Sequence, residues 1–261
     1  MIDKILEIIN EYKMNQLLGD SRFVNRMVIV LVDHYDLHKY LDRVDVIFSN
    51  STKNGSRYNS FNKHLIINLS EDYDLKKSLE MKDNYYRWYN LELTATILHE
   101  VEHIIQEKYK KEHPHDFESK ITERCDILPS GYNIKERIKN YITFRKYARC
   151  HDIVPIERMA NHNANNTLEE IIDGLDSHTT FDKSVIKSYR SYFDERKAKQ
   201  LLAGYELRGN YTNSPTMEYL NLIKKDENIS IPRELSPEKR LYLGLSLTRD
   251  EYHDFSKDMS R

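Results

Sequence analysis

The segment HEVEH at residues 99–103 constrains the fold of this chain more than any other feature. Two histidines four positions apart lie on one face of an α-helix, about 40° apart around its axis, so their imidazoles converge. The apolar residues of the surrounding stretch lie nearly opposite: Leu93, Ile97, Val101, Ile104 and Ile105. The sequence therefore predicts a helix over residues 91–109 that packs on one side and presents both histidines on the other.

This HExxH pattern indicates a metal site. The neutral imidazoles of His99 and His103, together with one carboxylate, form a three-ligand zinc site that leaves one position open for water. Glu100 projects beside that open position, where a carboxylate can accept a proton from the attacking water. Glu102 points away from the imidazoles and is expected at the surface. We therefore expect zinc (Zn2+) as the cofactor and Glu100 as the general base.

The third ligand must come from elsewhere in the fold, and Glu157 is the best candidate. At helical spacing it heads a stripe of small and apolar residues: Ala160, Ala164, Leu168, Ile171 and Leu175. A carboxylate in that place is costly unless it meets a cation or a metal ion. Asn161, one turn further on, can bind the second ring nitrogen of a zinc-bound histidine.

Several alternatives stay open. Glu157 can pair with Arg149 or Arg158 in a salt bridge, and the histidines can belong to a solvated helix face without a metal. The rival third ligands are Glu118, Glu123, Glu169, Glu170, His151 and His162. Spacing singles out no residue that would stabilise an oxyanion, and the residues weighed for that role are Tyr147, His151, Arg158, His162 and His178.

Together these residues resemble the gluzincin metallopeptidases, of which thermolysin is the familiar member. In that family HExxH precedes a helix bearing Glu-x-x-Ala/Ser-Asp/Asn, which Glu157, Ala160 and Asn161 match. The resemblance covers roughly residues 59–175 and implies a zincin-like fold that hydrolyses peptides. Two features depart from thermolysin-like enzymes: a longer gap from His103 to Glu157, and an asparagine in place of an acid. The metzincin continuation HExxHxxGxxH is absent, because Gln106 replaces its glycine.

The remaining pattern predicts helices and a small sheet. A first helix is expected over residues 2–19, and a second helix is expected to begin after an N-cap at Ser21. Further helices are expected over residues 117–128, 134–150 and 155–175, and beyond residue 182. Strands are expected at Val44–Ser49 and Lys63–Leu69, joined through a turn at 54–56. The gluzincin resemblance implies that Lys63–Leu69 is an edge strand that pairs with extended substrate.

The expected fold class is α+β and mainly helical. A zincin-like domain, in which the small sheet packs on the HExxH helix, is expected over residues 1–180. A helical C-terminal extension is expected over residues 181–261.

Composition narrows the possible partners. The 40 basic and 42 acidic residues leave a net charge of -2, so charge alone does not hold nucleic acid or an anionic membrane. The longest apolar run, Met27–Val32, is too short to cross a bilayer, and the first residues lack the apolar block of a signal peptide. We expect a cytoplasmic protein without nucleic-acid or membrane partners. Cys125 and Cys150 are expected to be reduced, with one disulfide as the alternative.

The predicted function is that of a zinc metallopeptidase that acts on an intracellular peptide or protein, with water at the metal activated by Glu100. One alternative is a non-catalytic zincin-like binding or regulatory module with a structural metal. Another is a helical interaction protein without a metal. Glu100 favours the enzyme, because a structural site has no use for a base beside the metal. The sequence specifies neither the substrate nor the oligomeric state.

Overall fold

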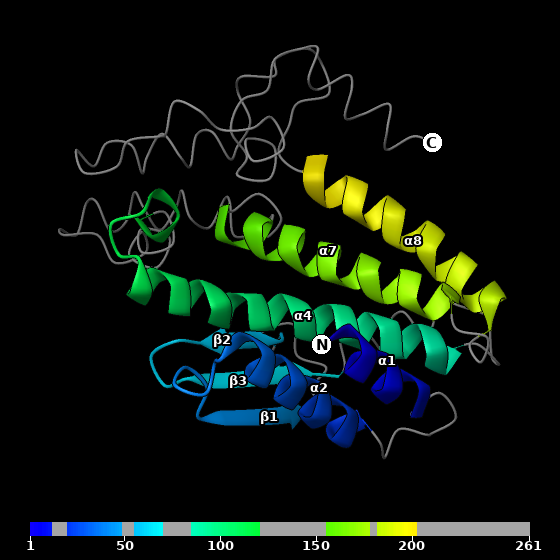
Figure 1. Ribbon diagram of the computed structural model, residues 1–261, viewed down its shortest axis with the longest axis horizontal. Coiled ribbons are helices and arrows are strands. Elements are labelled where there is room, and N and C mark those ends of the chain that lie inside the picture. Colours follow the sequence, from blue (N-terminus) through cyan, green and yellow to red (C-terminus); the bar gives the residue numbers. More distant parts are fainter. Residues whose placement is uncertain (12–19, 49–54, 70–84, 121–154, 178–181, 203–261) are drawn as a thin grey trace, which may run out of the picture. The chain divides into compact units, whose positions relative to one another are not determined.

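The computed structural model describes residues 1–11, 20–48, 55–69, 85–120, 155–177 and 182–202. The chain forms two compact units, one of residues 1–108 with 163–192 and the other of residues 109–162 with 193–261. The described elements are α1 (Ile2–Glu11), α2 (Asp20–Tyr35), β1 (Arg43–Ile47), β2 (Arg57–Asn59), β3 (His64–Asn68), α4 (Tyr85–Glu112), α7 (Pro155–Ser177) and α8 (Lys183–Leu202) (Figure 1). The described part is therefore mainly helical with one small sheet, which confirms the predicted α+β class.

The predicted helices on described residues are found, with shifted ends. The HExxH helix, α4, begins six residues earlier than predicted and ends at Glu112, just before the His113-Pro114 break. Helix α7 begins at Pro155, whose fixed φ suits the first turn of a helix. The prediction of Ser21 as an N-cap is wrong, because α2 already begins at Asp20.

Several predictions fall outside the described residues. These are the second part of the first helix (12–19), the turn residue Asn54, the helix over 134–150, most of the helix over 117–128, the domain boundary between residues 180 and 181, and the C-terminal extension beyond residue 202. Among the residues that the structure describes, every helix is too short or too polar to span a lipid bilayer.

The two predicted strands form one sheet, but their positions in it differ from the expectation. The strand order is β1-β3-β2, with β1 parallel and β2 antiparallel to β3. The strand predicted at Lys63–Leu69 is β3, so its assignment as an edge strand is wrong. The cause is β2, a strand of three residues that is too short to show a sequence pattern. Asn59 supports the return to β3, since its Oδ1 accepts hydrogen bonds from the backbone N–H groups of Phe61 and Asn62.

Helix α1 packs closely on α7 within the first unit. It buries four aliphatic side chains, namely Ile5, Leu6, Ile8 and Ile9. A Cβ at position 174 would lie only 2.8 Å from Leu6 Cδ1, so Gly174 lets the two helices approach. The burial of each of these side chains contributes about 1.5–3 kcal/mol, and Leu6 makes the contact with α7.

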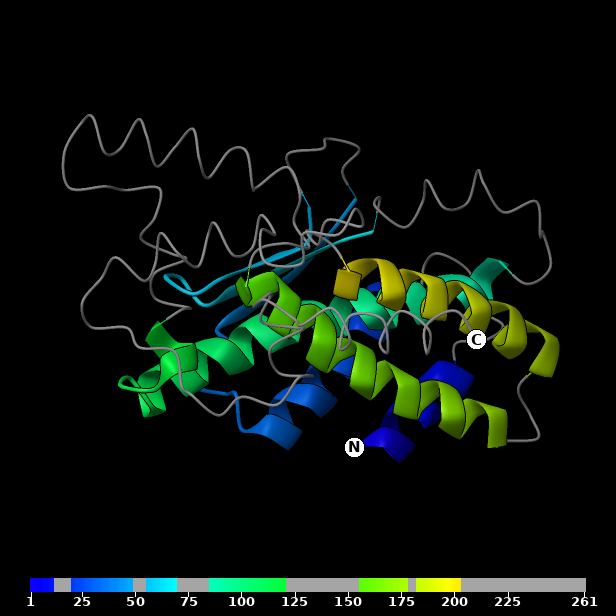
Figure 2. The ribbon, with the colours of Figure 1, turned by 90° about the horizontal axis from the view of Figure 1, so that it is seen from above.

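Helix α4 is buried on more than one side. Four residues of the predicted arc, Leu93, Ile97, Val101 and Ile104, are 0–1% exposed, whereas Ile105 is half-buried. Polar residues of the same helix are buried as well: Glu92, Glu100, Glu102, Gln106 and Glu107. Within the first unit, α4 lies between the layer of the sheet, α1 and α2 and the layer of α7 (Figures 1 and 2). The polar side of α4 therefore faces protein rather than solvent.

Helix α2 is followed by a residue other than glycine whose backbone adopts the strained left-handed conformation. Asp36 has a φ of 52°, and the N–H of Leu37 donates to the Val32 carbonyl over 2.9 Å. This pattern ends many helices, usually with glycine in the left-handed position. Lys108 of α4 also donates to the Tyr35 carbonyl over 2.9 Å, so the end of α2 is attached to α4.

Replacement of Asp36 by glycine tests this strain. Asp36→Gly should raise the free energy of unfolding by about 0.5–1 kcal/mol, because glycine adopts a positive φ without a Cβ clash. Denaturant and thermal unfolding would measure the change. Asp36→Ala is the control, since it removes the same carboxylate but keeps the Cβ and should give no gain. Equal stability of the two variants would contradict the assignment of strain.

Candidate metal centre

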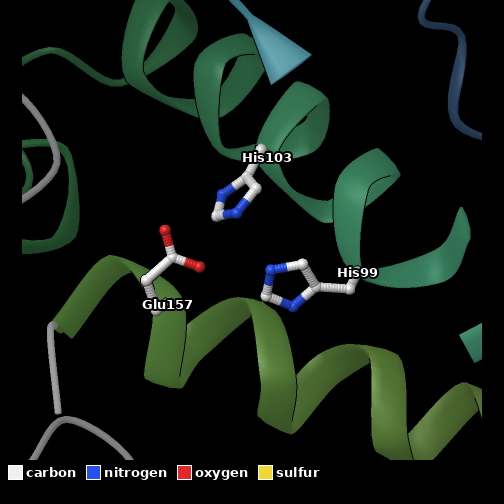
Figure 3. A group of neighbouring side chains, drawn as sticks. All are labelled: His99, His103 and Glu157. Atoms are coloured by element: carbon white, nitrogen blue, oxygen red, sulfur yellow. The ribbon is translucent and has the colours of Figure 1, made fainter. Parts of the chain in front are cut away.

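The side chains of His99, His103 and Glu157 come together in the structure. One possible ligand atom from each lies within 4.8 Å of the other two, and all three residues are half-buried. Figure 3 shows the two imidazoles of α4 and the carboxylate of α7 pointing toward one another. The imidazole centroids are 4.8 Å apart, with the ring planes at 87°. The i and i+4 spacing thus places both rings on one helix face, as the sequence predicts.

Glu157 is oriented by the stripe of residues that follows it on α7. The members of that stripe are 0–4% exposed: Ala160, Ala164, Leu168, Ile171 and Leu175. Glu157 shares their side of the helix and lies in the first turn, where the helix dipole favours an acidic side chain. The sequence prediction that this carboxylate heads a buried stripe is therefore confirmed.

Helix α7 is joined to α4 by a partly buried hydrogen bond. Asn163 Nδ2 donates to Glu102 Oε2 over 3.0 Å, six residues beyond Glu157 on α7. Glu102 is only 7% exposed, so its predicted place at the surface is wrong. Burial raises the pKa of Glu102 to about 7, against the opposing effect of the bond from Asn163. The prediction failed because it treated α4 as a helix with one buried side.

A residue that the sequence prediction overlooked supports His103. Gln106, one turn along α4, is 7% exposed, and its Oε1 lies 2.9 Å from His103 Nδ1. The i and i+3 spacing was the available signal. Asn161 was predicted to support a histidine ring, and its Oδ1 accepts a bond from Gln200 Nε2 over 3.3 Å. The supporting role of Asn161 stays a prediction.

Some of the rival ligands and other residues weighed for the site lie on residues that the structure describes, and the rest do not. Glu118, His162, Glu169 and Glu170 are described and do not belong to the group formed by the histidines and Glu157. Arg158 is buried, and its Nη1 donates to the Gln200 carbonyl over 3.2 Å. The other residues weighed lie outside the described part of the chain: Glu123, Cys125, Tyr147, Arg149, Cys150, His151 and His178.

Comparison of the chain with protein-family models, with curated proteins and with solved structures gave no match. The gluzincin resemblance therefore rests on the motif residues and their geometry alone.

The contact between α4 and α7 is open to a direct stability test. Glu102→Ala should lower the free energy of unfolding by about 0.5–1.5 kcal/mol, because it removes the partly buried hydrogen bond that Asn163 donates. Glu102→Gln should lose less, since its amide oxygen can accept the same bond. Thermal unfolding would measure both variants. Glu112→Ala, at an exposed position of the same helix, is the control and should change stability by under about 0.5 kcal/mol. A Glu102→Ala variant as stable as this control would contradict the role of the contact.

Proposed function

We propose that the protein is a zinc-dependent metallopeptidase in which His99, His103 and Glu157 hold the metal. The observation that carries the proposal is the convergence of two imidazoles and one carboxylate from two helices. Catalytic zinc sites use such a three-residue donor set with an open position, whereas structural sites use four ligands, commonly cysteines. Among the described residues, no further His, Cys, Asp or Glu joins the group.

The donor set also fits zinc by size. Zinc bonds of about 2.0–2.1 Å in a tetrahedral site require ligand atoms about 3.4 Å apart. The candidate ligand atoms lie within 4.8 Å of one another, so modest side-chain rotations would bring them to that separation. The half-buried setting favours binding, since burial strengthens the attraction between the carboxylate and a cation.

The proposed reaction is hydrolysis of a peptide bond. A bound zinc ion would act as a Lewis acid that polarises the scissile carbonyl and makes a water molecule more acidic. Glu100 follows His99 directly on α4 and is 6% exposed. In the proposal, its carboxylate accepts the proton of the attacking water and then donates that proton to the leaving amine.

The sequence resemblance supports a gluzincin-like site within a zincin-like fold, and the substrate class is then a peptide or protein inside the cell. Because β3 is paired on both sides, an extended substrate would pair with β1 or β2 instead. The near-neutral net charge supports a substrate other than nucleic acid or a membrane surface.

Metal content tests the ligand set. Protein purified without added zinc should contain about one zinc ion per chain, as a three-ligand site implies. Inductively coupled plasma mass spectrometry would measure the metal content. His103→Ala and Glu157→Ala should each remove most of it. Glu169→Ala is the control, because Glu169 is half-buried on α7 but outside the group, and it should keep the metal. Iron or no metal in the wild-type protein would overturn the zinc assignment, and full zinc content in Glu157→Ala would overturn the third ligand.

Loss of the base tests catalysis separately from metal binding. Glu100→Gln should lower kcat by about 10²–10⁴-fold while zinc content stays the same, because only the proton acceptor is removed. Cleavage would be measured as fluorescence released from quenched casein and by mass spectrometry of a proteome-derived peptide library. Glu112→Gln, at an exposed position of α4, should cleave like the wild type. Zinc-loaded wild-type protein that cleaves no more than Glu100→Gln would instead indicate a non-catalytic module with a structural metal.

A further inference from the structure

We propose that Gln106 is a positioning residue of the metal centre, which holds the His103 ring so that Nε2 is its ligand atom. The inference rests on the proposed zinc site, and it assigns a role to a residue outside the HExxH motif. The observation behind it is the 2.9 Å contact between Gln106 Oε1 and His103 Nδ1 on α4.

The chemistry of the contact determines which ring nitrogen carries the hydrogen. A side-chain amide oxygen only accepts hydrogen bonds, so Nδ1 of His103 must be the donor. A neutral imidazole has one N–H, and its lone pair is therefore on Nε2. Metal binding requires the neutral ring with an available lone pair. The contact thus selects the tautomer in which Nε2 is the ligand.

The contact also fixes the orientation of the ring. Gln106 is 7% exposed, so water competes little for its oxygen. The two residues are one turn apart on the same helix, and the helix backbone holds them together without a loop to order. A hydrogen bond to the outer nitrogen of a metal-bound histidine orients the ring and makes the ligating nitrogen more basic.

A neutral acceptor suits this position. Glu100 and Glu102 are buried on the same helix, and Glu157 lies beside the ring. A further carboxylate would add one more acidic side chain to a helix that already buries several. The glutamine oxygen orients His103 without that added charge.

Zinc affinity measured by competition with a chromogenic chelator tests the inference on the full chain. Gln106→Leu should bind zinc about 10–100-fold more weakly than wild type, the loss typical of a missing partner to a ligating histidine. Gln106→Glu keeps an acceptor and should bind zinc within about threefold of wild type or more tightly. This rescue distinguishes the hydrogen bond from mere packing. Asn90→Leu is the control, since it removes an equally buried amide of α4, 7% exposed, and should leave zinc affinity unchanged.

The tautomer gives a readout that needs no metal and no activity. Nitrogen chemical shifts of His103 in metal-free wild-type protein should show the hydrogen on Nδ1, and Gln106→Leu should shift the population toward Nε2–H. Should Gln106→Leu fail to fold, as judged by thermal unfolding, Gln106→Asn replaces it. Its amide is one methylene shorter, so it draws the oxygen away from the ring and should weaken zinc binding in the same way.

Three results would overturn the inference. The first is wild-type zinc affinity in both Gln106→Leu and Gln106→Asn, and the second is equal weakening in Gln106→Leu and Gln106→Glu. If either occurs while wild type binds zinc and Glu100→Gln loses hydrolysis, the proposed function stands and only the role of Gln106 fails. The third is a wild-type protein that binds no zinc, which would remove both proposals.

Discussion

The burial of α4 on opposite sides is the constraint on which the rest of the structure depends. One side carries the aliphatic arc that packs in the core, and the other carries acids, a glutamine and two histidines. Buried polar groups need hydrogen-bond partners, so neighbouring elements must supply them at particular positions. Tyr189 of α8 donates to Glu92 over 2.5 Å, and Asn163 of α7 donates to Glu102. These contacts determine how α4 is oriented about its own axis, and with it the direction in which the histidines project.

The three side chains of the candidate centre are carried by helices rather than loops. Both imidazoles come from successive turns of α4, and the carboxylate comes from the first turn of α7. Asn163 and Gly174 attach α7 to α4 and to α1, so the helix that carries Glu157 is held at two further points. Ligands on packed helices stay close to a binding geometry without a metal, which reduces the entropy lost when an ion binds.

The sequence predicted the elements whose signal is periodic and local. The histidine spacing, the aliphatic arc of α4 and the stripe below Glu157 each depend on the repeat of one helix, and each was found. The central position of β3 could not be predicted, because it depends on β2, which is only three residues long. The burial of Glu102 was missed for a related reason, since it depends on α7, which lies more than fifty residues further along the chain. Pairing between distant segments leaves no trace in the periodicity of either segment.

The charges near the two imidazoles favour a cation independently of the motif. Glu100 and Glu102 are 6% and 7% exposed, and Glu157 is half-buried beside the rings. Burial deprives a carboxylate of hydration, and it raises the pKa of Glu102 to about 7. Hydrogen bonds such as the one from Asn163 offset part of this cost, but they add no positive charge. A divalent ion between Glu157 and the imidazoles would place two positive charges beside that carboxylate, so charge and ligand chemistry both support the proposed site.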